Sequence, residues 1–387
     1  MRVRNLALLP AILFLVVSTP VSSGETPTSL VHHDIRVTLD PAAHTLEARD
    51  TVTLVAGRLA APDGILFILH SGLAPRAITA GVIVEPVAGR PDPAAFGLDG
   101  KNMEGPEASE VSVYRLLTKG GGVLPGVITL AYGGVIDHPL EQSGEEYAQS
   151  FSQTPGTIQE DGVFLSGSTY WYPWFNHEMV TFSLEVEKPA GWDALSEGTR
   201  AVNGPDRVRW ESEKPVDEIH LCAARFTVYE DQAGSVALYA YLRTPDETLA
   251  RKYLDTTAAY LEMYRGLLGR YPYDKFALVE NFWETGYGMP SFTLLGPRVI
   301  RFPFILHSSY PHEILHNWWG TSVFVDYRAG NWCEGLTAYL ADHLVKEGQG
   351  QGAESRRDAL TTYRHDVRSE RDFPLTECRS RPSPATE

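Results

Sequence analysis

The stretch HEILH, which begins at His312, constrains this 387-residue chain more than any other feature of its sequence. Pro311 suits the first turn of a helix and Gly320 suits its end, so the segment between them is predicted to be a short helix. With about 3.6 residues per turn, His312 and His316 point to the same side and can bind one metal ion. Glu313 is rotated by about 100° from His312, which lets it reach a water molecule at the metal without binding the ion.

A third ligand is needed, because a catalytic zinc ion takes three protein ligands and keeps one position open. The candidates downstream are Asp326, Glu334, His343 and Glu347. Glu334 lies at the start of a second predicted helix, residues 331–347, whose first turn can lie against the first helix. The alternative is that Glu334 forms a capping box with Asn331. Beside a helix with two histidines, metal ligation is favoured.

The first half of the chain has the alternating pattern of half-buried strands. DIRVTLD places Ile35, Val37 and Leu39 on one face, and MVTFSLEVEKP does so with residues 180, 182, 184 and 186. Gly/Pro-rich segments separate these runs. Residues 24–234 are therefore predicted to form an antiparallel β-rich domain, a sandwich with one face of each sheet buried.

The pattern changes near residue 234. One more alternating strand, SVALYAYL, leads into a helix for which Thr244 is the predicted N-cap, Pro245 the first residue, Glu247 the partner in a capping box and Gly269 the end. Its apolar face comprises Leu249, Tyr253, Leu261, Tyr264 and Leu268. Residues 235–387 are predicted to form a mixed domain that begins as α/β and becomes α-helical.

The N-terminus resembles an export signal. Arg2 and Arg4 precede the apolar run LALLPAILFLVV, and Ser23 is a small residue at a cleavage position. The run falls short of the roughly 20 apolar residues of a membrane span, so we expect cleavage after residue 23, no stable membrane anchor and a periplasmic or secreted protein.

Charge and cysteine content add further limits. The formal net charge of −16 argues against a nucleic-acid partner, because affinity for phosphates depends largely on Lys and Arg. The three cysteines, Cys222, Cys333 and Cys378, cannot form a closed disulfide framework, although one bridge is possible. The sequence does not indicate an oligomeric state.

HEILH followed by NWCEGLTAYL resembles the aminopeptidase N family of zinc metallopeptidases, the gluzincins. The family pattern is H-E-x-x-H, a spacer of 18 residues and a Glu within Asn-Glu-Gly; the spacer here is one residue shorter. The resemblance implies a saddle-like β domain followed by a thermolysin-like catalytic domain. It also implies one zinc ion bound by His312, His316 and Glu334, Glu313 as general base, and a peptide or protein substrate.

The sequence departs from the family on the substrate side. Family members carry Gly-x-Met-Glu-Asn, whose Glu pairs with the free α-amine of the substrate. The matching segment here is YGMPS, which keeps Met289 but has Pro290 and Ser291 at the last two positions. The backbone around Gly288 remains a candidate for pairing with a peptide. Two nearby carboxylates, Glu280 and Glu284, are candidates to replace the missing Glu; for Glu284 the alternative is an ordinary loop carboxylate.

The family also places a tyrosine after the glutamate ligand, where its hydroxyl stabilises the oxyanion. Tyr339 and Tyr363 are the tyrosines that follow Glu334, and neither matches; both are interpreted as structural, Tyr363 on a surface helix. Most of the helical lobe of a thermolysin-like domain is also missing. The hypothesis is that the chain is an N-terminal fragment of a longer family member, with an incomplete catalytic domain.

Three functions remain open from the sequence. The leading hypothesis is an exported zinc metallopeptidase that hydrolyses peptide bonds, similar to an aminopeptidase but with an altered amine-recognition motif. The second is a catalytically impaired or non-catalytic zinc-binding fragment that acts as a peptide-binding or protein-binding module. The third is a zinc hydrolase for another substrate, which draws on the leukotriene-hydrolysing branch of the family.

Overall fold

The computed structural model describes residues 31–54, 63–89, 92–96, 110–142, 152–176, 179–326, 329–367 and 373–377. The predicted export signal and Cys378 lie outside these residues. Within them, no helix is both long and apolar enough to cross a membrane. Cys222 and Cys333 are both buried free thiols.

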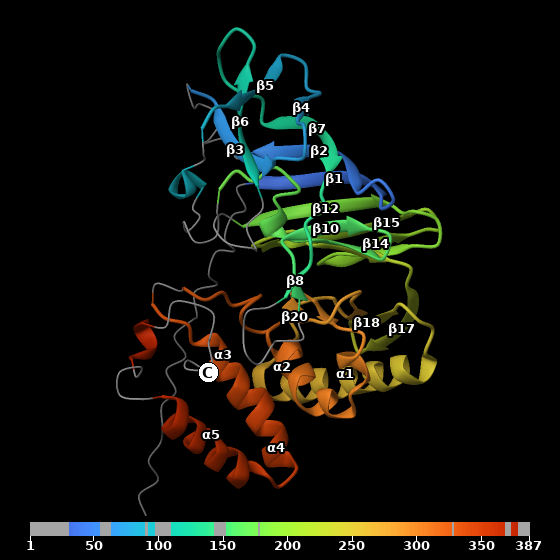
Figure 1. The fold of residues 1–387 in the computed structure, drawn as a ribbon, viewed down its shortest axis with the longest axis vertical. Helices are drawn as coiled ribbons and strands as arrows, with labels where there is room; N and C mark the ends of the chain where they lie inside the picture. Colours follow the sequence, from blue (N-terminus) through green and yellow to red (C-terminus); the bar gives the residue numbers. More distant parts are fainter. Residues whose placement is uncertain are drawn as a thin grey trace, which may run out of the picture.

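The N-terminal half is built around a seven-stranded sheet with the order β14-β15-β12-β1-β2-β7-β4 (Figure 1). Its strands are β1 (Val31–Asp40), β2 (Thr45–Leu54), β4 (Arg76–Ala77), β7 (Val127–Val135), β12 (Val180–Glu187), β14 (Thr199–Asn203) and β15 (Arg207–Val216). The inward side chains predicted on β1 and β12 are all buried, so the alternating pattern identified both strands correctly.

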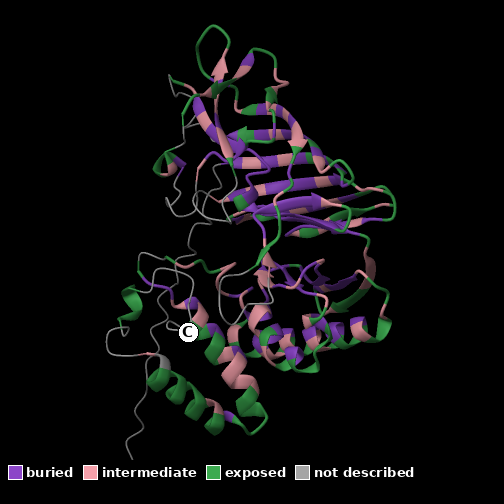
Figure 2. Ribbon diagram, in the orientation of Figure 1, coloured by how far each residue is buried: buried purple, intermediate pink, exposed green. Residues whose placement is uncertain are grey.

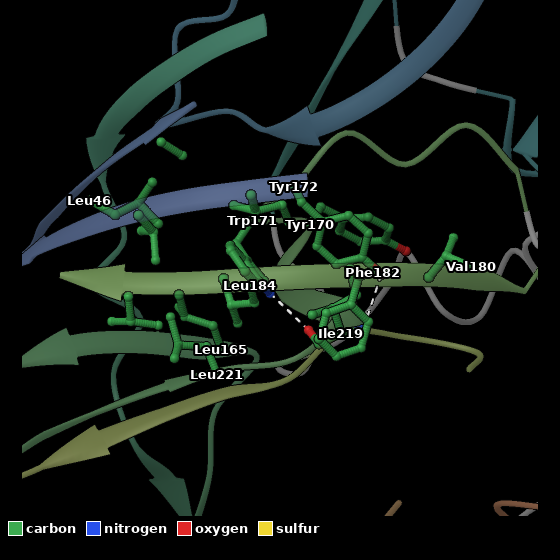
Figure 3. Packing of buried hydrophobic residues seen from close by; sticks show 14 of the residues in the cluster. Leu46, Leu165, Tyr170, Trp171, Tyr172, Val180, Phe182, Leu184, Ile219 and Leu221 are labelled. Carbon is green, nitrogen blue, oxygen red and sulfur yellow. Dashed lines mark hydrogen bonds between the residues drawn. The ribbon is translucent and has the colours of Figure 1, made fainter. Parts of the chain in front are cut away.

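A four-stranded sheet, β10-β11-β16-β13, covers this first sheet. Its strands are β10 (Gly156–Gln159), β11 (Gly162–Leu165), β13 (Asp193–Leu195) and β16 (Leu221–Ala224). Figure 3 shows Leu46 and Leu184 of the first sheet packed with Leu165 and Leu221 of the second. Trp171 is fully buried beside them, and its indole N–H donates to the carbonyl of Ile219 at 3.0 Å. The core of the sandwich lies between these two layers.

Two small sheets complete the N-terminal half. One has the order β3-β6-β5, with β3 (Ile65–His70), β5 (Val82–Val87) and β6 (Val111–Thr118). The other pairs β8 (Glu141–Gln142) with β9 (Ser152–Gln153). The β8–β9 pair reaches the C-terminal half, where the backbone N–H of Ser152 donates to the carbonyl of Glu284 at 3.1 Å.

The C-terminal half begins with a five-stranded sheet, β17-β18-β19-β21-β20. Its strands are β17 (Thr227–Ala233), β18 (Val236–Leu242), β19 (Lys275–Glu280), β20 (Gly286–Met289) and β21 (Phe292–Leu295). β18, β19 and β21 run parallel, whereas β20 runs antiparallel at the edge. β17 pairs with β18, so this sheet begins before the boundary predicted at residue 234.

β18 is the strand predicted from SVALYAYL. Its alternate side chains point to opposite faces of the sheet and pack into two different hydrophobic cores. Tyr239 and Tyr241 belong to the large N-terminal cluster of buried side chains. Leu238, Ala240 and Leu242 belong to the second cluster, which includes the buried face of the first α-helix. Six of its seven residues are therefore buried, five of them consecutively, although successive side chains still point to opposite faces.

α1 (Glu247–Leu268) is the helix predicted after β18, but its N-cap is Asp246, not Thr244. The Asp246 carboxylate accepts a hydrogen bond from the backbone N–H of Leu249 at 2.9 Å, so Thr244 and Pro245 lie before the helix. The helix starts at Asp246 because its carboxylate caps the first turn, although Thr244 and Pro245 are also residues typical of a helix start. The predicted apolar face is confirmed: Tyr253, Leu261 and Tyr264 are buried, and Leu249 and Leu268 pack against the same cluster.

The remaining helices are α2 (Ser309–Leu315), α3 (Cys333–Ala338), α4 (Leu344–Gly348) and α5 (Gly352–Asp366). A π-helical turn, Tyr339–His343, joins α3 to α4 without a break. α5 is exposed along nearly all of its described length, as predicted for the surface helix that carries Tyr363 (Figure 2). The predicted fold class is confirmed: a β-rich N-terminal part precedes a mixed part that ends in helices. The prediction that the N-terminal domain is antiparallel is wrong for one pair, because β1 and β12 run parallel.

Candidate metal centre

α2 and its last turn carry both histidines of HEILH. His312 lies inside the helix, and His316 follows it in helical conformation, with φ −54° and ψ −19°. Their ring centroids are 4.8 Å apart. Nε2 of His312 lies 3.2 Å from Oε2 of Glu334, and Nε2 of His316 lies 3.5 Å from the same oxygen. The predicted single-sided arrangement of the two imidazoles is therefore present.

Glu334 comes from the first turn of α3 and faces the histidines. Asn331 lies before the start of that helix, and its side-chain oxygen accepts from the backbone N–H of Cys333 at 3.1 Å. One ligand atom each from His312, His316 and Glu334 all lie within 4.8 Å of one another, the only such group of three found in the described parts of the chain. We call these three residues the metal group.

Two of the other downstream candidates, His343 and Glu347, have partners outside the metal group. His343 and Glu347 lie 3.5 Å apart, and both contact Arg356. Tyr339 is 61% exposed and stacks on the ring of His343 at 5.2 Å, and Tyr363 is half exposed on α5. The structural roles of the two tyrosines remain predictions.

The outward nitrogens of both histidines have partners that the sequence analysis missed. Nδ1 of His312 lies 3.2 Å from Oδ2 of Asp342, and Nδ1 of His316 lies 3.6 Å from Sγ of Cys333. Such contacts orient the rings of metal-binding histidines and leave Nε2 for the ion. Asp342 lies in the π-helical turn, a type of local structure that is often found at functional sites.

The electrostatics of the metal group favour a cation. Burial by itself would lower the pKa of His312, but the contacts with Asp342 and Glu334 outweigh it and raise this pKa to about 10. For His316 burial is likewise outweighed, by Cys333 and Glu334, and its pKa rises to about 11. Burial would raise the pKa of Glu334, but the two histidines hold it well below its ordinary value. Positive charge is thus strongly stabilised between these side chains.

The edge strand β20 lies directly against α2. A Cβ on Gly288 would collide with Oε2 of Glu313 and would lie 3.7 Å from Cδ2 of His316. Gly288 therefore allows the backbone of the strand to approach both side chains closely. Met289 is buried and pairs with Phe292 across the hairpin that joins β20 to β21. The structure thus places the backbone of Gly288 beside Glu313 and His316.

The two carboxylates proposed as substitutes for the missing Glu are engaged elsewhere. Glu284 accepts hydrogen bonds from the backbone N–H and Nε of Arg298 at 3.0 and 2.9 Å. Glu280 is 2% exposed and accepts from Arg301 at 2.6 Å and from the backbone N–H of Arg243 at 2.8 Å. Glu284, one of the predicted substrate-binding residues, is thus held by Arg298.

No protein-family model matches the chain, and no curated protein matches it. Solved structures do. An M1 zinc metallopeptidase mutant from Deinococcus radiodurans, bound to a Tyr-Ser-Ala substrate, superposes with a TM-score of 0.60 at 18% identity, over 91% of this chain and 78% of that chain. A two-domain M1 zinc metallopeptidase mutant bound to L-tryptophan gives 0.58 at 17% identity, over 91% and 80%. Yeast LTA4 hydrolase gives 0.56 at 13% identity, over 95% and 57%.

The chain has the fold of an M1 zinc metallopeptidase. In this M1 fold, the metal group offers two imidazole nitrogens and one carboxylate oxygen, which is a donor set found in catalytic zinc sites. The side chain of Glu334 is 36% exposed, so the group is reachable from solvent. The residues present therefore fit a zinc ion.

Proposed function

We propose that this chain is a zinc-dependent hydrolase of peptide bonds, with one zinc ion held by His312, His316 and Glu334. The observation that carries the proposal is the meeting of Nε2 of both histidines with Oε2 of Glu334, at 3.2 and 3.5 Å. The M1 fold supports a peptide substrate, because the related structures are peptidases. Resemblance to aminopeptidase N in particular remains a prediction.

The roles of the residues follow from their positions. Zinc held by the metal group would supply a Lewis acid that polarises a carbonyl group and acidifies water. Glu313 is the general base: its carboxylate takes a proton from the attacking water and gives it to the leaving amine. Because the carboxylate lies against Gly288, a peptide paired with the edge of β20 passes beside this base.

The test of this function is the substitution Glu313→Gln, which removes the base and keeps the size of the side chain. Peptide hydrolysis is expected to fall by about 10²–10⁴-fold, while metal analysis still finds one zinc ion per chain. The matched control is Glu262→Gln on the exposed surface of α1, which should change neither value. Unchanged hydrolysis in Glu313→Gln would remove the proposed base. Zinc binding without turnover by the wild type on a peptide library would favour a non-catalytic binding module.

We further propose that cleavage does not depend on a free α-amine. The support is that Glu280 and Glu284 are both engaged by arginines and that Pro290 has no charge to offer. Matched peptides with free and N-acetylated termini should be cleaved at similar rates. A strong preference for the free amine would refute this substrate class and leave the hydrolase proposal intact.

We also propose export of the protein, on the basis of the predicted signal at residues 1–23. Fractionation of expressing cells, with N-terminal sequencing of the mature protein, tests it. Retention of the uncleaved chain in the cytoplasm would contradict it.

A further inference from the structure

Lys275, the first residue of β19, is buried in a place where the proposed chemistry does not use it. Its side chain is 1% exposed, and Nζ donates to Oγ of Ser291 at 2.7 Å and to the Ser291 carbonyl at 3.2 Å. Nζ also lies 5.1 Å from the ring centroid of Trp210 and 5.2 Å from that of Phe292. A lysine is rarely buried unless its amine has partners, and here the partners belong to a single serine.

Ser291 occupies the turn that joins β20 to β21. Met289 pairs with Phe292, so Pro290 and Ser291 are the two central residues of the turn. Ser291 has a φ of 68°, in the left-handed region that the third residue of a type II turn requires and that normally favours glycine. The serine is also fully buried. Ser291 thus adopts a backbone conformation that is unfavourable for serine, and its hydroxyl contacts Lys275 in the interior.

Asn317 connects this turn to α2. It directly follows His316 and is fully buried. Its Oδ1 accepts from the backbone N–H of Ser291 at 2.7 Å and from the hydroxyl of Tyr271 at 3.0 Å. Its Nδ2 donates to the carbonyl of Glu313 at 3.2 Å. A continuous series of hydrogen bonds therefore runs from Lys275 through Ser291 and Asn317 to the backbone of the proposed base.

The series fixes the part of the sheet that faces a substrate. β20 is the edge strand, and Gly288 lies against Glu313 and His316. A shift of the hairpin would move this edge relative to the metal group, and small misplacements of a bound chain have large effects on catalysis. Other contacts also hold the hairpin: the hydroxyl of Thr293 donates to the carbonyl of Tyr287 at 2.9 Å, and the backbone N–H of Ala277 donates to the carbonyl of Ser291 at 3.0 Å. The series differs from them because it joins the hairpin to α2.

We infer that Lys275 and Ser291 are positioning residues that hold the β20 edge at a fixed place beside Glu313 and His316, so that a peptide strand is aligned by its backbone over the metal group. The inference rests on the proposed function and names its substrate-aligning element. It also gives a role to the serine that stands where the resembling family has an asparagine.

Two variants test the inference. Ser291→Gly removes the hydroxyl and suits the positive φ, so the turn should still form. Lys275→Met removes the amine and keeps an unbranched apolar side chain. Lys252→Met, at an exposed position on α1, is the matched control. Each protein is loaded with zinc and titrated with two probes, acetohydroxamate, which reports the zinc site alone, and an N-acylated peptidyl hydroxamate, which also reaches the edge of β20.

In the wild type and in Lys252→Met, the peptidyl probe should bind more tightly than acetohydroxamate. In Ser291→Gly and Lys275→Met, binding of the peptidyl probe should weaken by about tenfold, while affinities for zinc and acetohydroxamate stay within about twofold. A purely structural role would lower the unfolding temperature without separating the two probes.

The inference is overturned if both probes weaken equally, if neither changes, or if the wild type does not prefer the peptidyl probe. These results are distinct from failure of the proposed function. A wild type that separates the probes but cleaves no peptide would refute the hydrolase and leave the alignment by β20 in place.

Discussion

Two clusters in this molecule combine histidine with carboxylates in nearly the same way. In the metal group and its surroundings, His312 has Asp342 at Nδ1 and Glu334 at Nε2. In a second cluster, His220 has Glu197 at Nδ1 and Glu218 at Nε2, the latter at 3.5 Å. We call Glu197, Glu218 and His220 the closed cluster.

The two clusters differ in access and in how their atoms are used. The pair at the centre of the closed cluster, His220 and Glu197, is 3% and 0% exposed, and only Glu218 at its rim reaches 32%. In the metal group, His312 is 20% and Glu334 36% exposed. Glu197 also accepts from the backbone N–H of His220 and from the hydroxyl of Ser196 at 2.9 Å, so its oxygens are occupied by protein donors. In the metal group, a second histidine turns its Nε2 toward the same oxygen.

The difference shows that residue types alone do not make a metal site. A closed ion pair with its hydrogen bonds satisfied stabilises the fold, whereas an accessible set of converging donors can exchange protons for a cation. The following predictions test this division of roles, from the largest expected effect to the smallest.

Glu334→Gln should remove stoichiometric zinc and reduce peptide hydrolysis to background. The amide keeps the size of the side chain but loses the anionic oxygen that both Nε2 atoms approach. The loss of zinc affinity should exceed the roughly 100-fold cost of removing a hydrogen-bonding partner of a ligand. Metal analysis after dialysis against a weak chelator measures it. If Glu334→Gln keeps zinc at wild-type affinity, this carboxylate is not a ligand.

Glu197→Gln makes the same chemical change in the closed cluster and should have the opposite outcome. Zinc content should stay at one per chain, while the free energy of unfolding should fall by about 3–5 kcal/mol, because a buried charged partner is left uncompensated. Urea unfolding of the zinc-free proteins measures it. Equal destabilisation by Glu334→Gln and Glu197→Gln would show that the two clusters do not differ as described.

The part of the site that sequence could predict is the part governed by local geometry. The spacing of His312 and His316 follows from helical periodicity, and Glu334 follows from a short helix after a loop, supported by the family resemblance. The strands β1, β12 and β18 were predictable for the same reason, since alternation reports burial directly.

The rest depends on contacts between distant residues. Ser291 and Lys275 are 16 positions apart in the sequence, and neither residue signals a bond to the other. Asp342 reaches His312 from a π-helical turn that regular helical periodicity does not anticipate. Glu197 and His220 come from separate segments of the sandwich. The helix start at Asp246 was missed because Thr244 offered an equally good local signal.

Asp342→Asn should weaken zinc binding by about 10–100-fold without abolishing it. The amide still contacts Nδ1 of His312 but no longer supplies a negative charge that fixes the ring and its tautomer. Competition with a fluorescent chelator measures the affinity. Asp358→Asn, at an exposed position on α5, is the matched control. Unchanged affinity in Asp342→Asn would show that the orientation of His312 is set by packing alone.

The last expected effect, the smallest for a change of one pH unit, is a pH dependence that belongs to the closed cluster. Burial would lower the pKa of His220, but Glu218 and Glu197 outweigh it and raise this pKa from 6.5 to about 9. Between these values the folded chain holds a proton that the unfolded chain has released. The contribution of His220 to stability is therefore complete below pH 6.5 and is lost as the pH rises through about 9, by at most about 1.4 kcal/mol per pH unit.

The comparison that isolates this contribution is wild type against His220→Gln, both free of zinc, in urea at pH 6 and pH 9. Burial lowers the pKa of Lys275 to about 7, so that group titrates in the opposite sense and flattens the curve of the wild type alone. The pKa of Asp217 is also raised, to about 7, by partial loss of hydration and by the neighbouring Glu218, although this residue is exposed at the surface. Both groups remain in His220→Gln, so the difference in unfolding free energy between the two proteins should be larger at pH 6 than at pH 9. If the difference in unfolding free energy does not change with pH, His220 is neutral in the folded chain. The two clusters would then share their geometry but not a charged histidine.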